Sequence, residues 1–142
     1  NPLNHTLLPR MIPAPAEILA RIKDGDLLPP AAIAALDHDA ILDERDGDDA
    51  FEAEWTRCYN EIEKNWAAAD LDHKMVGLKD DIRRESFLSV SRATTRHEIA
   101  SYVSDDFDII VRGSILGMND PFLNALWDVY NRNEIPGPGT GK

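Results

Sequence analysis

The sequence predicts an all-α fold of about six helices, packed as a single compact orthogonal or bundle-like domain. Three observations support this prediction. Residues 49–69 carry apolar side chains at helical spacing without a miss, and Pro or Asp precedes several of the other apolar-periodic segments, as is usual at helix starts. The 142 residues, 43% of them hydrophobic, are near the commonest length of one domain and suffice for one core.

The N-terminal third is predicted to hold an arm and two short helices. Residues 1–14 contain three prolines and little periodicity, so we expect an extended N-terminal arm. The first helix should begin at Pro15 and end near Gly25, and the second should begin at Pro29 and Pro30. The second helix would carry one apolar side, made of Ile33, Leu36, Ala40 and Ile41.

An acidic run follows these two helices and extends from Asp37 to Asp49. Arg45 is its only Lys or Arg residue, and Gly47 marks a turn within it. Such a density of like charge is self-repelling, so we expect the run to form part of a face that binds a partner. The candidate partner-binding residues are Asp37, Asp39, Asp43, Glu44, Asp46, Asp48 and Asp49. The alternative is a solvated loop that aids solubility.

The helix predicted over residues 49–69 should anchor the core. Its apolar residues fall on one stripe of a helical wheel, and they are Phe51, Trp55, Cys58, Tyr59, Ile62 and Trp66. Asp49 with Glu52 three residues later has the pattern of a capping box. Because each aromatic side chain can bury roughly 150–250 Å², we expect Trp55 and Trp66 to be shielded from solvent.

The second half of the chain should add three helices. A fourth is expected over residues 72–93, although Lys79 and Arg83 intrude on its apolar side. Thr95 with Glu98 has a second capping-box pattern and would start the fifth. An alternative α+β fold has a short strand near residues 107–112, which are rich in β-branched side chains.

Asp120 and Pro121 are expected to start the last helix. The Gly- and Pro-rich residues 133–142 should form a flexible C-terminal tail. The predicted helical domain therefore spans residues 15–132.

The formal net charge of −11 excludes some partners and favours others. Residues 1–70 hold 15 acidic and 6 basic residues, whereas residues 71–142 hold 11 and 9. Phosphate binding requires a basic footprint, so direct nucleic-acid binding is not expected. No segment has the ~20 apolar residues that cross a bilayer, so no membrane association is expected. A basic protein is the expected partner.

Cys58 is the only cysteine and cannot form an internal disulfide. Since it lies in the apolar stripe, we expect a small buried side chain rather than a reactive thiol. A reducing compartment and a cytoplasmic location fit this cysteine usage. The chain starts at Asn1 rather than Met, which leaves open a leader removed from before it.

Adjacent His38 and Asp39 on a helix resemble the central metal-binding signature of the HD phosphohydrolases, which are also all-α. His5 lies upstream and Asp105 well downstream, at separations that looser versions of that signature allow. The resemblance implies a metal-dependent phosphohydrolase that uses His38, Asp39 and Asp105. The chain departs from the family at residues 41–42, where Ile and Leu replace a common Gly-Lys. We therefore expect no metal and no cofactor.

Asp106 falls within the apolar face of the predicted fifth helix, beside Tyr102, Val103 and Ile110. A buried carboxylate must find donors or shift its pKa upward. We expect Asp106 to accept hydrogen bonds from an indole, a Tyr hydroxyl or an Arg. In the alternative, a new helix starts at Ser104 and leaves Asp106 exposed in its first turn.

Three hypotheses for function follow. The first is an acidic helical domain that binds and neutralises or escorts a basic partner, such as the immunity protein or antitoxin of a toxin pair. The second is the HD-type hydrolase, although the sequence favours a binding protein over an enzyme. The third is a structural accessory domain, which would form oligomers.

Overall fold

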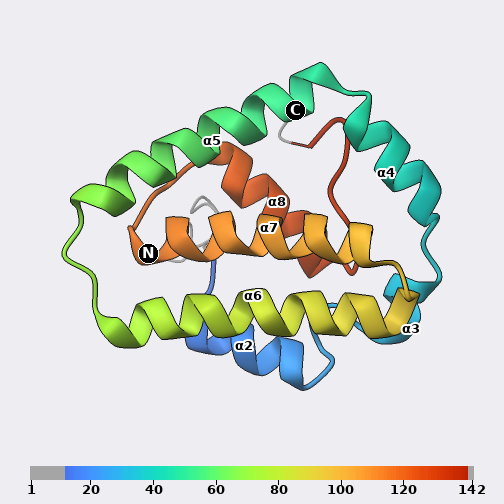
Figure 1. Ribbon diagram of the computed structural model, residues 1–142, viewed down its shortest axis with the longest axis horizontal. Coiled ribbons are helices and arrows are strands. Elements are labelled where there is room, and N and C mark those ends of the chain that lie inside the picture. Colours follow the sequence, from blue (N-terminus) through green and yellow to red (C-terminus); the bar gives the residue numbers. More distant parts are fainter. Residues whose placement is uncertain (1–11, 141–142) are drawn as a thin grey trace, which may run out of the picture.

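Helix α7, His97–Ile115, is the central element of the computed structural model, which describes residues 12–140 (Figure 1). Most of it is buried, since twelve of its residues are shielded from solvent, including Val103, Phe107 and Ile110. A helix that is buried on most of its sides must be enclosed by other helices. The core therefore centres on α7, and not on the helix that carries the aromatic stripe.

The fold is all-α, as predicted. The described residues form seven helices and no strand: α2 Pro15–Lys23, α3 Pro30–Ala34, α4 His38–Asp46, α5 Asp49–Ala68, α6 His73–Thr94, α7, and α8 Pro121–Asn131. Helices α6 and α7 lie side by side and antiparallel, with α2 below α6 and α5 above α7 in Figure 1. The alternative strand near 107–112 is wrong, because these residues lie inside α7, where all six are buried.

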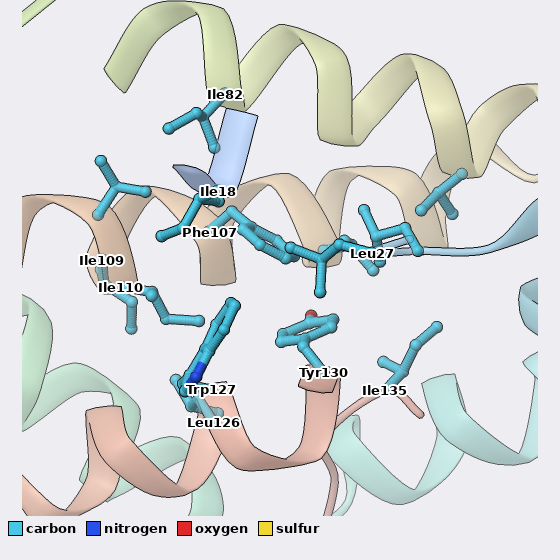
Figure 2. Close-up of a cluster of buried hydrophobic side chains, with 14 of the residues drawn as sticks. Ile18, Leu27, Ile82, Phe107, Ile109, Ile110, Leu126, Trp127, Tyr130 and Ile135 are labelled. Carbon is cyan, nitrogen blue, oxygen red and sulfur yellow. The ribbon is translucent and has the colours of Figure 1, made fainter. Parts of the chain in front are cut away.

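The centre of the core lies where α8 and α2 pack against α7. Phe107 of α7 packs against Tyr130 of α8, with ring centroids 4.7 Å apart (Figure 2). Trp127 of α8 is 1% exposed, and Ile18 of α2 and Ile82 of α6 are fully buried beside this group. These side chains are among the largest that are fully buried.

The predicted second helix is divided into two. Helix α3 ends at Ala34, and α4 begins after Asp37, whose carboxylate accepts a hydrogen bond from the Ala40 amide at 3.1 Å. An Asp in an extended conformation that satisfies a first-turn amide is a favourable N-cap. Most of the acidic run is thus helical, because Asp37 starts a new helix within the apolar pattern.

Helix α5 differs from its prediction in its cap and in its buried face. Asp48 is the N-cap and accepts from the Phe51 amide at 2.8 Å, so the capping box at Asp49 is wrong by one residue. Phe51, Cys58 and Ile62 are buried as predicted. Three other residues of the stripe are only half-buried: Trp55, Tyr59 and Trp66. The expected shielding of the two tryptophans is therefore incomplete.

Thr95 was predicted to cap the start of α7, but it lies at the end of α6. Thr95 ends α6 in the left-handed conformation, with φ of 56°, and Arg96 occupies the N-cap position of α7 without a side-chain bond. The Thr95 hydroxyl donates to the Thr94 carbonyl at 2.6 Å, so it is not free to cap the next helix. The expected capping box with Glu98 is thus not formed.

The last helix begins as predicted, with Asp120 accepting from the amides of Phe122 and Leu123 at 2.8 and 3.3 Å. Within the expected tail, Ile135 is 8% exposed and belongs to the core. Residues 1–11 of the expected arm lie outside the described residues, so the division into arm, domain and tail stays a prediction. No helix of residues 12–140 is long and apolar enough to span a membrane.

Candidate functional site

The predicted partner-binding carboxylates all lie on α4, at its start, or at the start of α5. Asp48 is half-buried and the other six are exposed, namely Asp37, Asp39, Asp43, Glu44, Asp46 and Asp49. The carboxylates of Asp37 and Asp48 accept hydrogen bonds from backbone amides and so cap α4 and α5. The chain therefore brings the acidic run to one exposed region, but two of its members have a structural task.

Two further acids of the run are paired within the chain. Asp39 accepts from the Arg96 guanidinium at 2.6 Å, and this bond holds the pKa of Asp39 below its usual range. Asp46 accepts from the hydroxyl of Tyr102, and this bond together with burial raises the pKa of Tyr102 to about 12. Within residues 12–140, the remaining three have no hydrogen bond or ion pair through their side chains: Asp43, Glu44 and Asp49.

The residues of the HD-like pattern face different partners. His38 Nε2 lies 2.8 Å from the Ile33 carbonyl oxygen, an acceptor, so this nitrogen donates. Asp39 binds Arg96, and Asp105 binds Arg83 at 3.1 Å. Within the described part of the chain, no group of three or more His, Cys, Asp or Glu residues is placed to hold a metal ion. His5 lies outside the described residues.

Asp106, fully buried on α7, joins four helices. Both Asp106 oxygens accept from the Arg45 guanidinium of α4, at 2.8 and 2.9 Å. The Trp55 indole of α5 donates to Oδ1 at 2.9 Å, and the Tyr130 hydroxyl of α8 donates to Oδ2 at 2.5 Å. The prediction of an indole, a Tyr hydroxyl or an Arg as donor is confirmed for all three, and Asp106 does not lie in an exposed first turn.

Arg45, the one Lys or Arg of the acidic run, is thus an internal anchor rather than a surface charge. It is 8% exposed, and its guanidinium lies 4.8 Å from the Phe51 ring centroid and 5.0 Å from that of Tyr102. Cation–π contacts add to the bidentate ion pair with Asp106. Burial and the Asp106 charge raise the pKa of Tyr130 well above its usual range, which keeps its hydroxyl a donor. This network fixes the acidic helix α4 against α7.

A cleft of about 440 Å³ opens above this network, between α4, α5 and α7. Arg45 belongs to its lining together with Asp46, Phe51, Glu52, Trp55, Tyr102 and Asp105. Three of these are exposed carboxylates: Asp46, Glu52 and Asp105. The cleft thus combines aromatic rings with an acidic rim, and we call it the acidic cleft.

A second hollow, of about 650 Å³, adjoins the first and shares Trp55 and Asp105 with it. We call it the aromatic groove, because the half-buried rings of α5 form one wall: Trp55, Tyr59 and Trp66. Trp55 and Tyr59 are stacked, with centroids 5.6 Å apart and planes 14° apart. The opposite wall carries Lys79 and Arg83 of α6.

The arginines and carboxylates of the aromatic groove are paired with one another. Arg112 is 6% exposed and bonds Asp108 at 2.8 Å and Glu63 at 2.6 Å. Its guanidinium also lies 5.6 Å from the Tyr59 ring centroid, and Arg83 approaches Asp108 at 3.4 Å. The groove is therefore polar at its base and aromatic at its wall.

Sequence reasoning placed the α5 aromatic residues in the core and so missed both hollows. One signal for the aromatic groove was present, because Lys79 and Arg83 fall on the apolar side of α6. Cations at those positions prevent α6 from packing against the α5 stripe, and Lys79 instead lies 5.8 Å from the Trp66 ring centroid. A hydrophobic stripe that meets a charged stripe indicates a groove rather than a sealed core.

Comparison with known proteins gives one family. Residues 17–137 match the family described as Immunity protein PIM1, and this match covers most of the chain and both hollows. No curated protein matches the sequence significantly.

Proposed function

We propose a toxin-binding function from one premise: the chain belongs to the PIM1 family of immunity proteins. An immunity protein protects its host by binding a toxin and blocking it. The family match carries this proposal, and the chain's own chemistry supports it through an exposed acidic run beside two hollows lined by aromatic side chains.

We further propose that the toxin has a basic surface and meets the acidic run together with the exposed side of α5. Asp43, Glu44 and Asp49 have no partner within the described residues, so their repulsion is uncompensated in the free chain. A basic toxin surface would relieve it. The proposed contact residues are Asp37, Asp39, Asp43, Glu44, Asp46, Asp48 and Asp49.

The affinity of such a complex would come from the aromatic side chains and not from the rim charges. Trp, Tyr and Arg are the residue types that most often dominate interface energies, especially in pockets that become desolvated. Trp55, Tyr59 and Trp66 are half-buried and therefore partly pre-ordered for such contacts. Complementary charges around them speed encounter and set specificity.

The location proposed for this function is the cytoplasm. Cys58 is fully buried and unpaired, and burial raises its pKa to about 12. A thiol of this kind is suited to a reducing compartment.

The proposal is tested by growth protection and by direct binding. We expect co-expression with the cognate toxin to restore growth, and the two purified proteins to form a complex measurable by calorimetry. Trp66→Ala should weaken the complex at least about tenfold, because a desolvated aromatic contact is lost. Phe87→Ala is the matched control, since Phe87 is also half-buried but stacks on His97 at the α6–α7 turn.

Absence of protection by a folded wild-type chain would overturn the toxin-binding function. If the wild type protects and Trp66→Ala binds the toxin as tightly as Phe87→Ala does, the immunity function stands. The aromatic groove would then not be part of the binding face.

A further inference from the structure

The acidic cleft and the aromatic groove differ in charge balance. The groove lining holds three cations, Lys79, Arg83 and Arg112, and three carboxylates, Glu63, Asp105 and Asp108, so its charges balance. In the cleft, the only cation is Arg45, and the buried Asp106 already balances it. Of the two hollows, the cleft is therefore the one that keeps an uncompensated negative charge.

Two carboxylates carry this excess. Glu52 is exposed and its carboxylate has no hydrogen bond or ion pair with any described residue. Asp46 accepts only from the neutral hydroxyl of Tyr102, so its charge remains. The third rim acid, Asp105, is already paired with Arg83 at 3.1 Å.

The floor of the cleft shows how the chain holds a guanidinium of its own between aromatic rings and a carboxylate. Arg45 lies within 5.0 Å of the centroids of two rings, Phe51 and Tyr102, while a carboxylate binds its edge through two bonds. A guanidinium fits this arrangement because it is planar, so its face can stack while its edge donates. An ammonium ion lacks both a stacking face and a paired donor edge.

We propose that the acidic cleft receives an arginine side chain of the toxin, held by the carboxylates of Glu52 and Asp46 against the Trp55 ring. This inference rests on the proposed function and names the chemistry of the partner. The guanidinium would neutralise the two uncompensated charges and cover the exposed part of Trp55. Desolvated arginine is a frequent energetic anchor in interfaces, which suits a cleft of about 440 Å³.

The first test uses the free amino-acid side chains as probes and needs no toxin. N-acetyl-arginine amide and N-acetyl-lysine amide are titrated into the full chain while NMR follows the Trp55 indole N–H. We expect a saturable shift with the arginine probe and at least about threefold weaker binding of the lysine probe. Glu52→Gln should weaken arginine binding about tenfold, because a charge-assisted hydrogen bond is lost.

Glu17→Gln is the matched control. Glu17 is exposed on α2, on the far side of α6 from α5, and this variant should bind the arginine probe as the wild type does (Figure 1). Equal binding by the wild type and Glu52→Gln would overturn the proposal, as would equal affinity for arginine and lysine.

The second test uses the toxin and separates this inference from the proposed function. Glu52→Gln should weaken the toxin complex about tenfold relative to Glu17→Gln. A toxin that binds both variants equally would overturn the arginine site while the immunity function stands. Failure of growth protection in the wild type would instead overturn the function, whatever the NMR titration shows.

Discussion

At the scale of single residues, Asp106 shows why a charged side chain can be the best choice for a helix centre. It is fully buried, and two nitrogens of Arg45, the Trp55 indole and the Tyr130 hydroxyl together supply four donors. A buried carboxylate is tolerated when its lone pairs are filled in this way. In return, one carboxylate fixes the positions of α4, α5 and α8 on α7.

Replacing Asp106 by Asn should therefore destabilise the fold strongly. The change leaves the Arg45 charge buried without a counter-ion, and loss of one partner of a buried pair costs about 3–5 kcal/mol. Chemical denaturation measures the free energy of unfolding. Asp105→Asn is the adjacent control, since Asp105 is 51% exposed and its pair with Arg83 should contribute about 1 kcal/mol or less. Equal losses in the two variants would contradict the assigned role of Asp106.

The sequence indicated that Asp106 would be buried and needed hydrogen-bond donors, but it did not fix which residues cap the helices. The apolar neighbours of Asp106 revealed that it needed donors and which types would serve. The caps of α5 and α7 were misplaced because Asp48 and Asp49 are chemically equal candidates, and Thr95 had a competing role in ending α6. Only backbone geometry separates such adjacent choices.

At the scale of helices, periodicity predicted α5, α6, α7 and α8 because each has at least one strong start signal or a long apolar stripe. The helix α4 was missed as a separate element. Its acidic sequence has little apolar periodicity, and its start depends on the single cap of Asp37. This short helix is stabilised by its cap and by the buried Arg45, together with the buried Leu42.

The close packing of α7 on α8 depends on Gly113. A methyl group at this position would lie 2.4 Å from Leu123 Cδ1, and Leu123 is fully buried. Gly113→Ala should lower the free energy of unfolding by about 1–2 kcal/mol, since overpacking outweighs the gain in helix propensity. Thermal and urea denaturation would measure this loss.

Gly77→Ala is the matched control for this element. Gly77 lies within α6 and is exposed, and a methyl group added to it would have no heavy atom of a neighbouring residue within 4 Å. The same substitution there should raise the free energy of unfolding by up to about 1 kcal/mol. A stabilising effect at both positions would show that α7 and α8 are not in close contact at Gly113.

At the scale of the whole molecule, function depends on how the charges are distributed, and sequence revealed only part of this. The acidic half was evident from residues 1–70. The two hollows were not. The aromatic groove arises where the α5 stripe meets Lys79 and Arg83 of α6 without sealing against them, and the acidic cleft arises between α4, α5 and α7. The way in which helices pack on one another decides that outcome, and the periodicity within a single helix does not determine it.

If the acidic run steers a basic toxin, removing its unpaired charges should slow association while leaving the fold intact. Asp43→Asn, Glu44→Gln and Asp49→Asn together remove three charges, and none of these carboxylates has a partner within residues 12–140. Asp46 and Asp48 are kept, because they bond Tyr102 and cap α5. This choice separates electrostatic steering from stability.

The association rate constant of this triple variant should fall about five- to tenfold at ~20 mM salt, and the difference should nearly vanish at ~0.5 M, where charges are screened within a few ångströms. Stopped-flow mixing with the toxin would measure it. The control triple, Glu17→Gln, Asp24→Asn and Glu85→Gln, removes the same charge from α2, its C-cap and α6. An equal decrease of the association rate constant in both triple variants would show that net charge alone steers the toxin. If the association rate constant decreased in neither variant at any salt concentration, the acidic run would have no role in recognition. Complementary charge acts chiefly on the rate of encounter.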